Sequence, residues 1–420
     1  MTSQPTFRIR MTPVFARDVR VTVSMAILFA LIALATQASI AQTYHVIYNF
    51  SGCADGAFPT STLAIDRGGS LYGTTEAGGM SCGGNGSGVV FRLKRVGSGW
   101  LDTPLHSFTG GTTDGSVPAN YGGLTLGPDG AWYGTTTAGG AASLGVVFRL
   151  RPPAHACATT LCPWTEDLVH CFAGNDDGSM PFSNIIFDAQ GKMYGTTSEG
   201  GSDSGTVFGI IPSGSGWTES ILYDVGGLPF AGLTIDHSGN LYGVNYEGGQ
   251  GSGTVFELTP SGSGWTRTVL HTFSGGADGS NPLGGLLLDA AGNLFGSTIA
   301  SGANGGGTIF ELSPSGGGWT FNVIASLQGG AGPGSTLTLD AVGNLYGTTL
   351  TDGALGCGTV FRLSPSGQGW MYTSLHEFQC GNDGITPVGG VTLDASGNLY
   401  GTAAEGGASN GGLVWEITPN

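Results

Sequence analysis

One seven-residue phrase recurs along this 420-residue chain and constrains the fold more than any other feature. It reads GSLYGTT at 69–75, GAWYGTT at 130–136, GKMYGTT at 191–197, GNLYGVN at 239–245, GNLFGST at 292–298, GNLYGTT at 343–349 and GNLYGTA at 397–403. The aromatic residues of successive copies are 61, 61, 48, 53, 51 and 54 residues apart. Periods of this size indicate a propeller, a solenoid or another repeat array.

The composition selects the kind of repeat. The chain holds 80 glycines without a three-residue period, which excludes collagen, and it is 40% hydrophobic and 10% charged, which excludes disorder. Glycine clusters between short runs of Val, Leu, Phe and Tyr indicate tight turns between strands. Helical periodicity is absent beyond the first forty residues. The sequence therefore predicts an all-β protein.

Each unit of about fifty residues contains four strand-like segments. They resemble GGLLLDA (284–290), GNLFGST (292–298), GTIFEL (307–312) and TRTVLHTF (266–273). An Asp-x-x-Gly turn joins the first two, and hairpins such as PSGGGW (314–319) join the last two. Four antiparallel strands per repeat fit a propeller blade better than a solenoid coil of about 20–30 residues.

The two ends of the repeat region complement each other. The last unit stops after its third strand at LVWEITPN (413–420), whereas TYHVIYNF (43–50) reads as a spare fourth strand. Pairing them closes a ring and removes exposed sheet edges. We expect a seven-bladed β-propeller of four-stranded antiparallel blades, closed by the N-terminal strand joining the three strands of the C-terminal blade.

Two resemblances support this interpretation. The order of a G-x-x-x-D strand and a G-N-x-Y strand resembles the blade of NHL-type propellers. The segments GTVFEL (253–258), LHTFSGGADGSNPLGGL (270–286) and GNLYGTT resemble the GloVer tandem repeats of exported bacterial "choice-of-anchor" proteins, over about residues 43–420. This second resemblance implies an exported or cell-surface repeat protein and carries no established activity. No anchor or sorting motif follows the last strand, so the resemblance leaves open whether the protein is retained or released.

Residues 1–41 have the pattern of a secretory signal peptide. Four arginines (Arg8, Arg10, Arg17 and Arg20) precede an apolar run at 21–35 and the small-residue site Ser39-Ile40-Ala41. The alternative is an uncleaved membrane anchor, but the run is shorter than the roughly 20 residues that a spanning helix needs. We expect cleavage after Ala41 and a single propeller domain at 42–420, secreted or held at the bacterial cell surface or in the periplasm.

The mature chain would be strongly acidic, with a net charge of about −19. Such a surface repels nucleic acid and anionic membranes and favours cationic partners. Seven cysteines in an exported chain indicate disulfides rather than a zinc finger. The candidate disulfide cysteines are Cys53, Cys82, Cys157, Cys162, Cys357 and Cys380, and Cys171 is expected to be a buried thiol within a strand.

The sequence gives little indication of a catalytic site. His106, His170, His271 and His376 recur on the fourth strand of different blades, so they cannot converge on one ion, and a packing or hydrogen-bonding role is expected. The Trp that opens this strand, as at Trp265, is expected to pack between blades rather than to stack on sugars. The apolar cores of the innermost strands carry no ionisable side chain, and no nucleophile, zinc or paired-carboxylate motif occurs.

Acids concentrate instead in loops expected on one face of the disc. Antiparallel strands place the connections between blades and the second-to-third strand connections on the same side. The candidate ligand-binding or cation-binding residues are Asp55, Asp114, Asp177, Asp278 and Asp383 in the first kind of loop, and Glu76, Glu199, Glu247 and Glu405 in the second. Flexible, oxygen-rich loops suit Ca²⁺, the only cofactor considered. The alternative is that Asp-Gly merely forms good turns and the acids keep the surface soluble.

Three functions follow as hypotheses. The first is a non-enzymatic, monomeric binding or scaffold protein that takes an extracellular protein, glycan or matrix polymer on its acidic face, with or without Ca²⁺. The second is an extracellular lyase, lactonase or glycan hydrolase with its site in loops over the central channel. The third is a structural module of the envelope or matrix.

Overall fold

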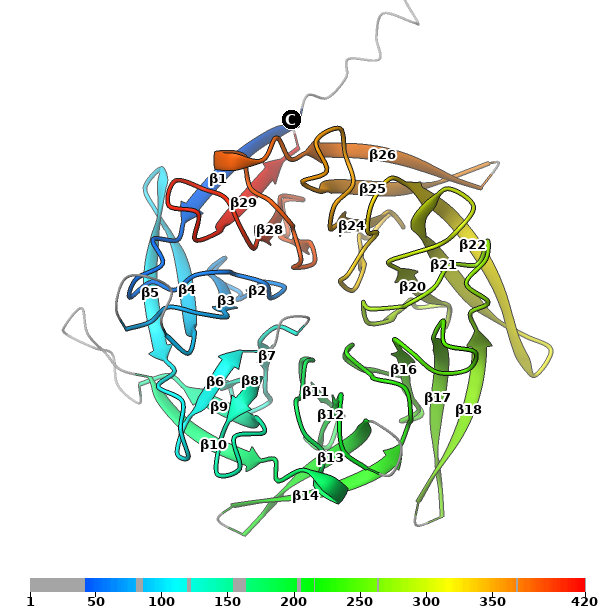
Figure 1. Cartoon of the computed structure of the whole chain (residues 1–420), viewed down its shortest axis with the longest axis horizontal. Helices are drawn as coiled ribbons and strands as arrows, with labels where there is room; N and C mark the ends of the chain where they lie inside the picture. Colours follow the sequence, from blue (N-terminus) through cyan, green and yellow to red (C-terminus); the bar gives the residue numbers. More distant parts are fainter. Residues whose placement is uncertain are drawn as a thin grey trace, which may run out of the picture. The chain divides into compact units, whose positions relative to one another are not determined.

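Seven antiparallel sheets surround a central axis in the computed structural model (Figure 1). The structure describes residues 42–80, 86–118, 122–153, 164–201, 205–214, 216–262, 264–367 and 369–419. Residues Tyr44–Thr418 form one compact unit. We number the sheets as blades 1 to 7 and call their strands innermost, second, third and outer, counting from the axis.

The blades have the following strands. Blade 1 holds β2 (Ala64–Ile65), β3 (Leu71–Thr75), β4 (Val89–Val96) and β5 (Gly99–Ser107); blade 2 holds β7 (Thr125–Leu126), β8 (Trp132–Gly139), β9 (Val146–Arg151) and β10 (Thr165–Cys171), with β6 (Gly115–Pro118) also paired to β8. Blade 3 holds β11 (Ile186–Phe187), β12 (Met193–Thr197), β13 (Thr206–Ser213) and β14 (Gly216–Asp224); blade 4 holds β15 (Thr234–Ile235), β16 (Leu241–Asn245), β17 (Thr254–Ser261) and β18 (Gly264–Thr272). Blade 5 holds β19 (Leu287–Leu288), β20 (Leu294–Thr298), β21 (Gly305–Ser315) and β22 (Gly318–Gln328); blade 6 holds β23 (Thr338–Leu339), β24 (Leu345–Thr349), β25 (Thr359–Ser366) and β26 (Gly369–Glu377). Blade 7 holds β27 (Thr392–Leu393), β28 (Leu399–Ala403), β29 (Leu413–Thr418) and β1 (Thr43–Asn49), and two short 3₁₀ turns, η1 (Asn175–Asp177) and η2 (Gly381–Asp383), lie in loops.

Blade 7 closes the ring as the sequence predicts. Its sheet order is β1-β29-β28-β27, so one strand from the beginning of the chain completes a sheet whose other three strands come from its end. The backbone N–H of Phe50 donates to the carbonyl of Gly412 over 3.0 Å, and the Phe50 ring is fully buried. The prediction of a seven-bladed propeller closed in this way is confirmed.

The recurring phrase makes contacts that explain why it recurs. In GNLYGTT of blade 6, the Tyr346 hydroxyl donates to Asp340 over 3.1 Å, and Asp340 also accepts the backbone N–H groups of Val342 and Asn344. Its first threonine, Thr348, donates to the Gly389 carbonyl of blade 7 over 3.1 Å. The phrase therefore fixes one turn within its own blade and one hydrogen bond to the next blade.

The hairpin tryptophans pack between blades. The Trp319 ring of blade 5 meets Tyr242 of blade 4 edge-on, with centroids 5.8 Å apart, and Trp100 of blade 1 meets Tyr400 of blade 7 at 5.9 Å. Equivalent pairs join Trp164 to Tyr72, Trp217 to Tyr133, Trp265 to Tyr194 and Trp370 to Phe295. Edge-to-face aromatic pairs stabilise by about 0.5–1.5 kcal/mol beyond burial, so these contacts help hold the ring together.

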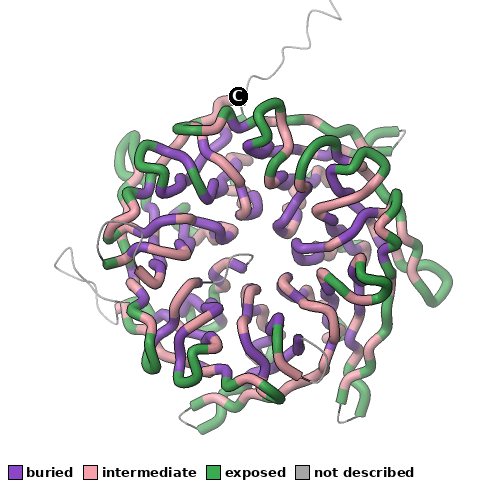
Figure 2. Tube along the Cα trace, in the orientation of Figure 1, coloured by how far each residue is buried: buried purple, intermediate pink, exposed green. Residues whose placement is uncertain are grey.

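The core consists of layers between blades rather than one central cluster. Each hydrophobic cluster combines side chains from two adjacent blades, as when Phe91 of blade 1 packs with Tyr400 and Val414 of blade 7. The second and third strands are buried, and exposure concentrates in loops and outer hairpins (Figure 2). Within the described ranges, no helix is long and apolar enough to span a bilayer.

Candidate functional site

The blade-to-blade loops and the second-to-third strand loops lie on one face, which we call the loop face. Backbone bridges join the two kinds of loop directly at Ser179–Glu199, at Ser280–Ala300 and at Ile385–Glu405. The opposite face, which we call the turn face, carries the Asp-x-x-Gly turns and the outer hairpins. All nine acids proposed from the sequence belong to loop-face segments.

The five loop aspartates are hydrogen-bonded within their own loops. In blade 6, Asp383 accepts the backbone N–H of Gln379 over 2.6 Å and lies 3.0 Å from Nε2 of His376. Three other loop aspartates accept a backbone N–H from four or five residues earlier and also lie beside the imidazole of an outer-strand histidine. These pairs are Asp114 with His106, Asp177 with His170 and Asp278 with His271. Asp55 accepts the backbone N–H of Ser51 and the hydroxyl of Tyr48 instead. These carboxylates thus shape the loops that carry them.

At Asp114 and Asp278 these bonds also favour the ionised carboxylate. Burial opposes ionisation of Asp114, but hydrogen bonds from His106 and Thr109 outweigh it and lower its pKa. The same balance, with Ser274 and His271 as donors, lowers the pKa of Asp278. The histidines of the L-H-x-F segments therefore have the hydrogen-bonding role that the sequence analysis expects, and each holds one loop aspartate.

The four loop glutamates differ from the aspartates. Glu76 is half-buried, and burial raises its pKa although Thr60 donates to it. Glu199, Glu247 and Glu405 are exposed, and only their backbone groups have hydrogen bonds among the described residues. Three carboxylates of the loop face therefore have no hydrogen bond or ion pair within the described chain.

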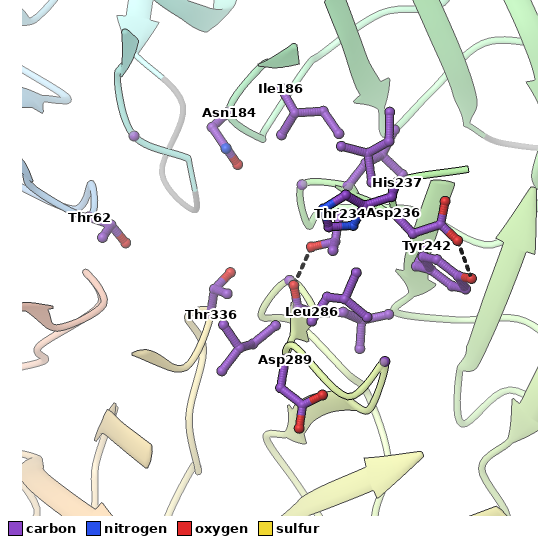
Figure 3. Close-up of a pocket in the computed structure, with 18 of the residues that line it drawn as sticks. Thr62, Asn184, Ile186, Thr234, Asp236, His237, Tyr242, Leu286, Asp289 and Thr336 are labelled. Carbon is purple, nitrogen blue, oxygen red and sulfur yellow. Dashed lines mark hydrogen bonds between the residues drawn. The ribbon is translucent and has the colours of Figure 1, made fainter. Parts of the chain in front are cut away.

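The central channel contains a cavity of about 880 Å³. Thr62, Asn184 and Thr336 extend into it from the innermost segments of blades 1, 3 and 6, with glycines such as Gly232 and Gly285 between them (Figure 3). Thr234 donates to the Leu286 carbonyl of the next blade and so seals part of the wall. Away from the turn face, the described wall presents hydroxyl, amide, backbone and aliphatic groups, which suit an uncharged polar ligand rather than an ion.

Ionisable groups reach the cavity only near the turn face, as far as the described lining shows. Asp236 and Asp289 accept backbone N–H groups of their own turns, and Asp236 also accepts the Tyr242 hydroxyl over 3.1 Å. His237 is exposed beside them. Among the described residues that line this cavity, the only carboxylates are those of these turns, where they accept backbone N–H groups.

One disulfide lies on the loop face. Cys357 in a second-to-third strand loop bonds Cys380 in the following blade-to-blade loop, with Cα atoms 5.5 Å apart. Cys53 is also disulfide-bonded, but the candidate partners Cys82, Cys157 and Cys162 lie outside the described residues. Cys171 is a free thiol in β10 and is half-buried rather than fully buried.

The repeat pattern matches a known family over most of the chain. Three overlapping matches to the Gloeobacter/Verrucomicrobia repeat cover residues 33–167, 158–329 and 229–420. The chain belongs to the Gloeobacter/Verrucomicrobia repeat family. The structure shows that seven units of this repeat family build one closed propeller in this chain.

Solved structures with a similar arrangement are distant in sequence. A proposed gluconolactonase is 14% identical with a TM-score of 0.42, covering 90% of this chain and 92% of that one. A proposed 6-phosphogluconolactonase of Bacteroides uniformis is 16% identical, with a TM-score of 0.47 and coverages of 76% and 84%. A gluconolactonase of Xanthomonas campestris is 13% identical, with a TM-score of 0.36 and coverages of 67% and 83%. No functionally curated protein matches the chain.

Sequence reasoning missed a set of outer-strand acids. Asp102, Glu166 and Glu219 lie at equivalent positions two residues after the hairpin tryptophan, and each faces the aspartate loop of the preceding blade. Burial raises the pKa of each of these three carboxyls to about 7. A comparison of this one position between repeats could have singled them out, because other repeats carry Arg267, Phe321 or Tyr372 there.

Proposed function

We propose that this protein is an exported, non-catalytic binding propeller whose loop face takes a cationic extracellular partner, a protein or a matrix polymer. The observation that supports it is that the aspartates and the glutamates of the loop face differ in their hydrogen bonding. The aspartates accept hydrogen bonds within their own loops, whereas Glu199, Glu247 and Glu405 are exposed and their carboxylates have no hydrogen bond or ion pair among the described residues.

The charge of the whole chain supports the same choice. The sequence has 29 acidic against 13 basic residues, and four of the arginines fall in the proposed signal peptide. A negative field of this size accelerates encounter with a positive partner and disfavours anionic ones. A ring closed between β1 and β29 gives the three glutamates a rigid platform, which reduces the entropy lost on binding.

Ca²⁺ has less support than a cationic macromolecule. A calcium ion takes six to eight oxygen ligands, whereas the aspartates of four of these loops lie against a histidine nitrogen of the outer strand, which Ca²⁺ does not favour. A hydrolytic or lactonase activity also has less support. Of the carboxylate and imidazole groups in the described cavity lining, Asp236 and Asp289 are engaged in their own turns, which leaves the exposed imidazole of His237.

The test measures binding to immobilised poly-lysine and to partly deacetylated chitosan at physiological salt. The variant Glu199→Gln/Glu247→Gln/Glu405→Gln removes three charges from the loop face. The variant Gln190→Lys/Ala290→Lys/Ser396→Lys raises the net charge equally at exposed positions of the turn face. We expect about a tenfold loss of affinity for the first variant, corresponding to about 1.4 kcal/mol, and less than twofold for the second.

Two outcomes would overturn the proposal. Equal losses in both variants would show that net charge alone attracts the polymer, without a defined face. Retention of full affinity by the glutamine variant would place the partner elsewhere on the molecule.

A further inference from the structure

Four junctions between neighbouring outer strands share one pair of residues and differ in a third. Each has a histidine on the outer strand and the loop aspartate that follows it. The pairs are His106 with Asp114, His170 with Asp177, His271 with Asp278 and His376 with Asp383. A side chain from the outer strand of the next blade then covers each pair.

At two junctions the third residue is aromatic and stacks on the histidine. Phe321 of β22 lies parallel to His271, with ring centroids 3.7 Å apart and planes inclined by 4°. Tyr44 of β1 lies on His376 in the same way, at 3.7 Å and 2°. The aromatic ring fills the space between the blades at these junctions, so the histidine and aspartate have no room for a third polar group.

At the other two junctions a glutamate takes the place of the aromatic ring. Ligating atoms of His106, Asp114 and Glu166 all lie within 4.8 Å of one another, and those of His170, Asp177 and Glu219 do as well. Nε2 of His106 is 3.2 Å from Oδ1 of Asp114 and 3.9 Å from Oε2 of Glu166. Each cluster contains residues of two blades and therefore bridges them.

One carboxylate oxygen of each glutamate lacks a hydrogen-bond partner within the described chain. Oε1 of Glu166 and Oε1 of Glu219 are both buried without a hydrogen-bond partner among the described residues. The Glu166 side chain is only 11% exposed and the Asp114 side chain 9%. A buried carboxylate oxygen without a donor is costly. Asp102 has the same defect at the equivalent position of blade 1, but among the described residues only Glu166 and Glu219 have it beside a histidine and an aspartate with which they could share a metal ion.

The chemistry of the cluster selects the partner. One imidazole nitrogen and two carboxylates suit a divalent transition metal, since Ca²⁺ and Mg²⁺ prefer oxygen ligands alone. Zn²⁺ binds nitrogen at about 2.0–2.1 Å and carboxylate oxygen at about 2.0–2.2 Å, which separates tetrahedral ligand atoms by roughly 3.3–3.5 Å. The distances around His106 bracket that value, so small side-chain rotations would complete three corners, with water at the fourth.

We propose that His106, Asp114 and Glu166 form one Zn²⁺-type metal site and that His170, Asp177 and Glu219 form a second. The two ions would clamp blade 1 to blade 2 and blade 2 to blade 3 at the outer rim. Binding an ion between the two groups replaces the hydrogen bond between Nε2 of each histidine and its aspartate. This inference goes beyond the binding function proposed above, because neither site uses Glu199, Glu247 or Glu405.

The test is metal content after loading the EDTA-treated full-length protein with Zn²⁺ and dialysing it. We expect two tightly held ions per chain, one in Glu166→Phe, one in Glu219→Phe and none in the double variant. Phenylalanine is chosen because Phe321 occupies the equivalent place in blade 5. Glu166→Gln/Glu219→Gln repeats the test with side chains of unchanged size. The same variants loaded with Co²⁺ should lose the visible absorption of a tetrahedral site.

Two further variants sharpen the outcome. His271→Ala/His376→Ala removes the histidines of the aromatic junctions and should keep two ions. Phe321→Glu recreates the cluster beside His271 and Asp278 and should raise the content to three. The proposal would be overturned if Glu166→Phe/Glu219→Phe and Glu166→Gln/Glu219→Gln both kept the metal content of the unaltered protein. It would also be overturned if the unaltered protein retained no Zn²⁺.

Discussion

Tyr44 and His376, 332 positions apart in the sequence, stack with their rings 3.7 Å apart and within 2° of parallel. The Tyr44 hydroxyl also donates to the Asp383 carbonyl over 2.7 Å. Tyr44 lies on β1 of blade 7 and His376 on β26 of blade 6, so the strand that closes the ring is fixed to the neighbouring blade as well as to its own sheet.

Substitution of Tyr44 tests how much this contact stabilises the closed ring. We expect Tyr44→Ala to lower the free energy of unfolding by about 2–3 kcal/mol through lost ring burial and stacking, and Tyr44→Phe by about 1 kcal/mol through the lost hydroxyl bond. Equilibrium urea unfolding measures both. His45→Ala, at the exposed neighbouring position of β1, should change stability by less than about 0.5 kcal/mol. Equal effects of the two alanine variants would contradict a specific role for the stack.

We expect Asp102 to lower the stability of the folded protein in a pH-dependent way. Burial, reinforced by the charge of Asp55, raises the pKa of Asp102 to about 7 from an ordinary value near 4, and its Oδ1 is buried without a partner among the described residues. The folded state therefore keeps a proton that the unfolded chain releases between about pH 4 and pH 7. Stability from this group falls as pH rises through that window.

Asp102→Asn should remove the penalty. We expect the variant to be more stable than the unaltered protein at pH 8, by on the order of 2 kcal/mol, and nearly equal to it at pH 4. Thermal unfolding across this pH range measures the difference. Asp176→Asn, at an exposed loop position, serves as the control and should show no such pH-dependent gain. A gain that grows toward low pH would have the wrong sign.

The tyrosine of the repeated phrase offers an internal comparison. Tyr346 donates to Asp340, whereas the equivalent Phe295 has no hydroxyl to offer Asp289. We expect Tyr346→Phe to cost about 1 kcal/mol and Phe295→Tyr to stabilise by up to about 1 kcal/mol. Chemical denaturation of both variants checks the opposite signs. Loss of stability in Phe295→Tyr would show that the hydroxyl does not fit beside Asp289.

The glycine of the phrase is required by packing. A Cβ atom at Gly347 would lie 2.7 Å from Cζ of Phe361 and 2.9 Å from Cδ2 of Leu337, which are both buried. We expect Gly347→Ala to destabilise by about 1–3 kcal/mol because the ring of Phe361 has no free space to enter. Gly99→Ala is the control, since a Cβ there meets nothing within 4 Å. Calorimetric melting of both proteins compares them directly.

Much of the architecture could be read from the sequence because each repeat encodes its own local geometry. The Asp340-to-Gly343 turn, the strand alternation and the hairpin before Trp370 depend on neighbours within a few residues. Ring closure could also be predicted, because the spare segment 43–50 and the incomplete last unit form a matched pair. The interblade role of the tryptophans followed from their recurrence at one repeat position.

The roles of the acids could not be read in the same way. Asp114 and Glu199 look equivalent as loop acids, yet one is buried against His106 and the other is exposed. Comparison between repeats could single out the position of Glu166, but not its partners, because the residues it meets lie in the preceding blade, 52 and 60 positions away. The hydrogen bonds of the four histidines agree with the expectation, but the meeting of His106 and His170 with an acid of the next outer strand was not foreseen.

The sequence by itself determined the repeat, the strand order within a blade and the closure of the ring, since these depend on local turn chemistry and on the count of segments. Only the tertiary structure decided which carboxylates are used in hydrogen bonds within the fold, which remain exposed and which are buried against a histidine of another blade. The physical reason is that these side chains become buried, and come close to other charges, only where two blades pack together. The residues that meet there are far apart in the sequence, and no local pattern shows which of them will be neighbours.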